Sequence, residues 1–127
     1  MVNALLHSEI HDLEREIARC EEELDILDRE ERIIRRLQDE ITNEVEEPVK
    51  RYDMTVSDEF RGSLETSAEE MQNQIYTETR LLQEHTSELL SEMVRARDRI
   101  REHIEKCRRR IDQLLAEIEA ESHNCAM

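Results

Sequence analysis

Apolar residues alternate at spacings of four and three positions in two stretches of the chain, and this repeat constrains the fold more than any other feature. One stretch runs from Leu6 to Leu27 and the other from Ile100 to Ile118. Such spacing gives a helix one continuous apolar stripe, which is typical of a coiled coil. The members are Leu6, Ile10, Leu13, Ile17, Cys20, Leu24 and Leu27, then Ile100, Ile104, Cys107, Ile111, Leu114 and Ile118.

The composition favours a purely helical fold. The 127 residues include one Gly, one Pro and 2% aromatic residues, whereas 40% are charged. A β-sandwich or an α/β enzyme needs turn residues and aromatic or β-branched strands that this chain does not supply. The charged residues also alternate too regularly with Leu and Ile for a disordered chain. We therefore expect an all-α fold.

The numbering of the two stretches predicts how the helices pair. In antiparallel helices the numbers of facing residues add to a constant, which is 124 for Leu6 with Ile118 and for Leu24 with Ile100. Its midpoint is Gly62, the only glycine. The charges agree, because residues 95–110 hold eight basic and three acidic residues, whereas residues 14–29 hold three basic and seven acidic ones.

These patterns predict one domain, an antiparallel two-helix hairpin (coiled coil) that turns near Phe60-Arg61-Gly62. Within residues 1–127 we expect a first arm over about 3–47, a connection over 48–66, a second arm over 67–121 and a flexible tail over 122–127. The inner stripe is expected to slip near Ile33 and then continue through Ile34, Leu37, Ile41 and Val45, and through Leu64, Met71, Ile75, Leu82, Leu89 and Met93.

Proline and serine mark the expected ends of the arms. Pro48 has no backbone donor, so the first arm should kink or stop near it. Ser67 opens a capping-box pattern, and Ser63 is a competing cap one turn earlier.

Further apolar residues lie off the inner stripe and predict a helical partner. A two-helix hairpin covers one side of each arm, so a second stripe needs another helix to cover it. Self-association into a four-helix bundle would satisfy the same surface. The partner-facing residues are Leu5, Ile26, Ile33, Leu81, Leu90, Val94 and Leu115.

The turn carries the only motif, an aromatic residue two positions before Gly62. Together with two heptad arms and an acidic net charge of −15, Phe60-Arg61-Gly62 resembles the WXG-motif, ESAT-like superfamily, and most the small helical-hairpin partners of LXG toxins in Gram-positive type VII secretion. Phe60 stands where Trp is usual. The C-terminal Tyr-x-x-x-Asp/Glu export signal is missing, since Arg80 follows the last tyrosine, Tyr76, by four residues.

This resemblance implies a targeting factor or chaperone that binds the helical N-terminal region of a toxin, another small hairpin protein, or both, with the export signal on a partner. The alternative is a stand-alone structural homodimer, such as a scaffold or a prefoldin-like holdase. A prefoldin-like protein would also need β-hairpins, for which the chain has no strand pattern.

The residues favour no catalytic, metal or cofactor chemistry. His7 and His11 are spaced for one metal on a helix, with Glu117 as a cross-helix neighbour, but a solvated face explains them better. Cys20 and Cys107 fit the inner stripe as small apolar residues. Two paired helices offer no concave catalytic site. We therefore expect a non-enzymatic protein with no metal and no cofactor.

The charge and hydropathy also bear on partners and location. The Arg-rich residues 95–110 lack interleaved aromatics and face an acidic stretch, so we expect no nucleic-acid partner. The sequence has neither a signal-peptide pattern nor an apolar run long enough to span a membrane. We expect cytoplasmic synthesis without membrane insertion, and export, if any, together with the partner.

Overall fold

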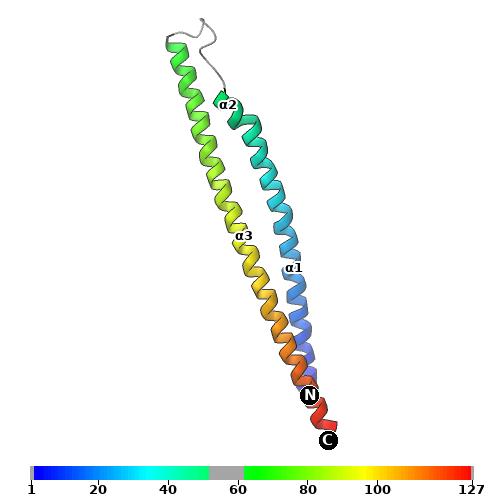
Figure 1. The fold of residues 1–127 in the computed structure, drawn as a ribbon. Helices are drawn as coiled ribbons and strands as arrows, with labels where there is room; N and C mark the ends of the chain where they lie inside the picture. The colour runs from blue at the N-terminus through cyan, green and yellow to red at the C-terminus, as the bar shows by residue number, and fades with distance from the viewer. Residues whose placement is uncertain (1, 52–61, 127) are drawn as a thin grey trace. The chain divides into compact units, whose positions relative to one another are not determined.

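The computed structural model describes residues 2–51 and 62–126, and these residues are almost entirely helical. Figure 1 shows α1 (Val2–Ile41), α2 (Glu47–Arg51) and α3 (Ser63–Ala126), and a π-helical turn, η1 (Thr42–Glu46), joins α1 to α2. No strand occurs among the described residues. The predicted all-α class is confirmed.

Pro48 widens the first helix rather than ending it. The π-helical turn η1 comes directly before Glu47 and Pro48, and helical structure continues to Arg51. Proline lacks the amide that would bond to Glu44, and its ring crowds that carbonyl. A wider turn relieves such crowding and absorbs one extra residue.

Helix α3 begins earlier and ends later than residues 67 and 121. It starts at Ser63, directly after Gly62, whose φ of +83° is a left-handed conformation that favours glycine. The Gly62 carbonyl accepts a hydrogen bond from the Thr66 amide at 3.2 Å. At the other end, Ser122 to Ala126 contain neither Gly nor Pro to stop the helix, which continues through them. Of the predicted turn, Phe60 and Arg61 lie outside the described residues.

The chain divides into two compact units, each formed from parts of the first and last helices. Unit 1 comprises Met1–Arg29 with Met93–Met127, and unit 2 comprises Glu30–Glu92. The buried apolar residues of unit 1 follow the predicted stripe. They are Ile10, Cys20, Met93, Ile104, Cys107 and Leu114.

Ion pairs within unit 1 connect acidic residues of α1 to the basic stretch of α3. Glu9 accepts from Arg110 at 3.1 Å, and Asp28 pairs with Arg97 at 3.0 Å. In these two pairs the residue numbers rise along α1 as they fall along α3. The numbers of Asp28 and Arg97 add to 125, one above the predicted constant of 124, whereas those of Glu9 and Arg110 add to 119, five below it.

Polar side chains occupy part of the interior between the helices of unit 2, beside apolar residues such as Ile34 and Leu90. Gln83 donates to the Gln38 carbonyl at 3.0 Å and to the Thr42 hydroxyl at 2.9 Å, and Gln38 donates to Ser87 at 3.0 Å. The least exposed positions of α3 in this unit keep the four-and-three spacing. They are Gln72, Tyr76, Thr79, Gln83, Thr86 and Leu90.

Candidate functional site

The apolar row of α3 in unit 2 faces solvent, contrary to the prediction that it continues the inner stripe. Leu82 and Leu89 are 52% and 46% exposed, whereas Leu90 is only 5% exposed. Leu82 directly precedes Gln83 of the interior row, and Leu89 directly precedes the buried Leu90. The prediction was wrong because the buried row of α3, which includes Leu90 and Met93, keeps its four-and-three spacing through unit 2. Leu82 and Leu89 lie one position off this row. The exposed row is Leu64, Met71, Ile75, Leu82 and Leu89.

Apolar residues of the first helix show the same displacement. Leu37 and Val45, predicted on the inner stripe, are exposed, as is Ile33. The less exposed row instead runs through Glu31, Ile34, Gln38 and Ile41 without a slip. Each of the three exposed residues directly precedes a less exposed one, as in α3.

Residues that precede the facing positions of two antiparallel helices lie on the same side of the pair. Unit 1 shows this geometry, because Glu9 contacts Arg110 and Glu16 contacts His103, and all four directly precede facing residues. The same relation in unit 2 brings the exposed rows of both helices to one side. We call this surface the apolar face of unit 2, and it comprises Ile33, Leu37, Val45, Leu64, Met71, Ile75, Leu82 and Leu89.

The predicted partner-facing residues do not form one surface. Leu90 is buried, so its assignment was wrong, and the other six are exposed. In unit 1, Leu5 and Ile26 precede facing positions, whereas Val94 and Leu115 follow them and lie on the opposite side. In unit 2, only Ile33 belongs to the apolar face, because Leu81 lies one position further from the facing row.

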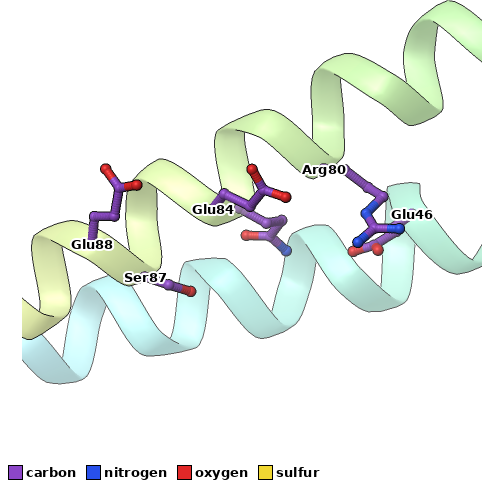
Figure 2. A pocket seen from close by; sticks show the side chains of 6 residues that line it. Glu46, Arg80, Glu84, Ser87 and Glu88 are labelled. Atoms are coloured by element: carbon purple, nitrogen blue, oxygen red, sulfur yellow. The ribbon is translucent and has the colours of Figure 1, made fainter.

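A shallow polar pocket lies in unit 2, on residues that follow the facing positions of α3. Figure 2 shows the Arg80 side chain directed toward Glu46 across the helices. Gln83, Glu84, Ser87 and Glu88 complete the lining. The pocket is acidic, and its residues follow the facing positions of α3, whereas the residues of the apolar face precede them. The polar pocket and the apolar face therefore lie on different sides of unit 2.

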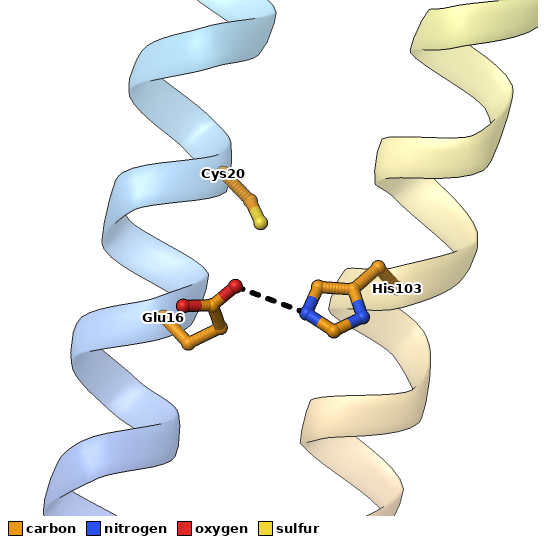
Figure 3. A group of neighbouring side chains, drawn as sticks. All are labelled: Glu16, Cys20 and His103. Atoms are coloured by element: carbon orange, nitrogen blue, oxygen red, sulfur yellow. Dashed lines mark hydrogen bonds and ion pairs between the residues drawn. The ribbon is translucent and has the colours of Figure 1, made fainter.

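Unit 1 contains a thiol cluster that the sequence analysis did not recognise. Figure 3 shows Glu16 and Cys20 on α1 beside His103 on α3, and their ligand atoms all lie within 4.8 Å of one another. His103 Nε2 lies 3.1 Å from Glu16 Oε1 and 3.7 Å from Cys107 Sγ. We define the thiol cluster as Glu16, Cys20, His103 and Cys107. Its sequence signal is a pair of four-residue spacings, Glu-x-x-x-Cys and His-x-x-x-Cys.

The electrostatics of the cluster follow from its partial burial. Cys20 and Cys107 are buried free thiols, and burial raises the pKa of Cys20. Glu16 also accepts a hydrogen bond from Arg19, which holds the pKa of its carboxyl below the usual value. The thiols are thus shielded, whereas His103 is half exposed. His7 and His11, whose four-residue spacing could suit a metal, are both exposed.

Comparisons with family models, curated proteins and solved structures found no match to this chain. Across the described residues, no helix is both long enough and apolar enough to cross a membrane.

Proposed function

We propose that this chain is a non-enzymatic helix-binding protein that docks a partner helix on the apolar face of unit 2. In this proposal the complete chain is an antiparallel coiled-coil hairpin that turns near Phe60-Arg61-Gly62. The partner helix would bury the apolar side chains that unit 2 exposes.

The reversal of polarity in unit 2 carries the proposal. Its interior row on α3 holds Gln72, Thr79 and Gln83, while Met71 and Leu82, each one position earlier, are exposed. A helix pair stabilised only by its own contacts would gain by burying the apolar row. An exposed apolar stripe over both helices is typical of a helix-binding groove.

Charge narrows the chemistry of the partner. Residues 62–92 contain seven Glu and a single basic residue, Arg80. A basic amphipathic helix would therefore dock favourably, with its apolar residues against the face and its Lys or Arg residues beside these carboxylates. A second copy would instead bring its own acidic residues 30–92, which hold 17 Asp and Glu against seven Lys and Arg. This repulsion favours a different protein over a homodimer.

The resemblance to LXG-toxin partners indicates one candidate, the helical N-terminal region of such a toxin. Its gene would lie beside the gene for this chain. The chain would then serve as a targeting factor or chaperone, and a homodimeric scaffold or holdase is the alternative.

Two adjacent leucines provide a matched test. Leu81 and Leu82 are equally exposed, at 52%, but only Leu82 lies on the apolar face. We expect Leu82→Ser to weaken binding of the toxin region by about tenfold or more, a loss of about 1.4 kcal/mol. Leu81→Ser should leave affinity nearly unchanged. Isothermal titration calorimetry with the full chain measures both.

Equal effects of the two variants would contradict docking on this face. Light scattering of the free chain tests the alternative. A stable dimer that dissociates in Leu82→Ser and ignores the toxin region would favour the homodimer.

A further inference from the structure

We propose that Glu16, Cys20, His103 and Cys107 form a zinc site that joins α1 to α3 within unit 1. This site is independent of the helix-binding face, which lies in unit 2. It revises the expectations of no metal and of cysteines that only pack.

Three of the four ligand atoms, on Glu16, Cys20 and His103, are already gathered, and Cys107 contacts the His103 nitrogen. Zinc lies about 2.3 Å from sulfur and about 2.0–2.1 Å from nitrogen, so neighbouring ligand atoms are about 3.3–3.8 Å apart. His103 Nε2 is already 3.1 Å from Glu16 Oε1 and 3.7 Å from Cys107 Sγ. Cys20 Sγ lies within 4.8 Å of both Glu16 and His103 ligand atoms. A four-ligand site therefore requires the Cys107 side chain to turn toward the group formed by Glu16, Cys20 and His103.

The arrangement of the ligands on the helices also suits a metal. Residues four apart lie on the same helix face, so each helix offers one buried thiol and one less buried ligand a turn away. The buried thiols are protected from solvent, while the half-exposed His103 leaves a path for the ion to enter. Two thiolates, one imidazole and one carboxylate favour zinc over magnesium or calcium, which prefer oxygen ligands alone.

A neighbouring heptad shows what an ordinary contact looks like at the same position. Glu9 and Arg110 occupy the places of Glu16 and His103 one heptad further along, and they form a simple ion pair at 3.1 Å. At the thiol cluster, the arginine is replaced by a histidine, which can bind a metal, and cysteines lie beside it in the seam. Packing alone would account for the cysteines but not for this coincidence with His103.

Cobalt substitution of the full chain tests the proposal, because Co²⁺ bound to thiolates has characteristic visible and charge-transfer absorption. A Cys125→Ser background removes the third thiol. In that background we expect one equivalent of Co²⁺ to bind with a thiolate spectrum and Zn²⁺ to displace it. Zn²⁺ should raise the melting temperature and EDTA should reverse the increase.

Single replacements distinguish a ligand from a packing residue. Cys20→Ser and Cys107→Ser should each weaken cobalt binding by roughly a hundredfold or more, because thiolates dominate such sites. Glu16→Gln should change the spectrum while both thiolate contributions remain. His11→Gln is the control and should leave binding unchanged. Circular dichroism verifies that each variant keeps its helix content.

The proposal is overturned if cobalt absorption lacks thiolate bands, or if these bands persist when both Cys20 and Cys107 are replaced. Failure of the chain to retain Co²⁺ or Zn²⁺ at micromolar concentration under reducing conditions would also overturn it. A disulfide between the two cysteines that forms in the presence of excess Zn²⁺ would do the same.

Discussion

Separate replacement of Leu89 and Leu90 by alanine tests the register of α3 in unit 2. The two residues are adjacent and chemically identical, yet Leu89 is 46% exposed and Leu90 is 5% exposed. Truncation to alanine removes three carbon atoms, at about 0.8 kcal/mol for each one that is fully buried. For Leu90 this gives about 2.3 kcal/mol, to which incomplete collapse of the cavity adds. We expect a loss of about 2–4 kcal/mol.

The corresponding loss for Leu89→Ala should be about 1 kcal/mol or less. Its side chain is only half covered, and part of that cover persists in the unfolded chain. Alanine also favours helix slightly more than leucine does. The free energy of unfolding comes from urea titration followed by circular dichroism. The titration is run at a concentration where light scattering gives a monomer mass.

A larger loss for Leu89→Ala than for Leu90→Ala would refute this register. It would restore the stripe predicted from hydrophobicity alone, with Leu82 and Leu89 inside. Equal losses would show that neither row is the interior of unit 2.

Two further predictions concern the interior of unit 2 and the start of α3. Gln83→Leu should raise the free energy of unfolding by about 1 kcal/mol, because it adds apolar contact and removes a buried amide oxygen that has no hydrogen-bond partner among the described residues. The two hydrogen bonds that Gln83 donates are lost, but their acceptors, the Thr42 hydroxyl and the Gln38 carbonyl, remain bonded to each other. Urea titration measures the gain, and a loss would contradict a dispensable polar layer. Gly62→Ala should cost about 1–2 kcal/mol in the same assay, since φ is +83° and no atom of the described residues lies within 4 Å of the added Cβ, so the cost is that of the backbone. A neutral Gly62→Ala would mean that the left-handed conformation is not needed.

The sequence predicted unit 1 better than unit 2, and the difference has a physical reason. In unit 1 the apolar repeat and the buried row coincide, so hydrophobicity alone identifies Ile10, Ile104 and Leu114. In unit 2 they separate, because a continuous helix keeps the register of its buried part even where the next apolar residues fall one position away. For this reason the apolar pattern predicted Leu90 to be partner-facing, although it is buried.

The thiol cluster illustrates a second limit. Cys20 and Cys107 were each placed on the inner stripe, and they are buried there. The contact between Glu16 and His103 joins residues that flank the buried row on two different helices. Predicting it requires the alignment of α1 against α3. The cluster could have been identified from the two four-residue spacings, but only after the antiparallel register was known.

The π-helical turn before Pro48 has a consequence for how this protein can tolerate changes in length. In a regular heptad, the residue after Leu37 on the same face would be Glu44, yet the exposed apolar residue is Val45. The wide turn Thr42–Glu46 takes up one additional residue, so Val45 returns to the side of the helix occupied by Ile33 and Leu37. A one-residue insertion is thereby accommodated inside a helix rather than in a loop, and the phase of the apolar face is preserved across it.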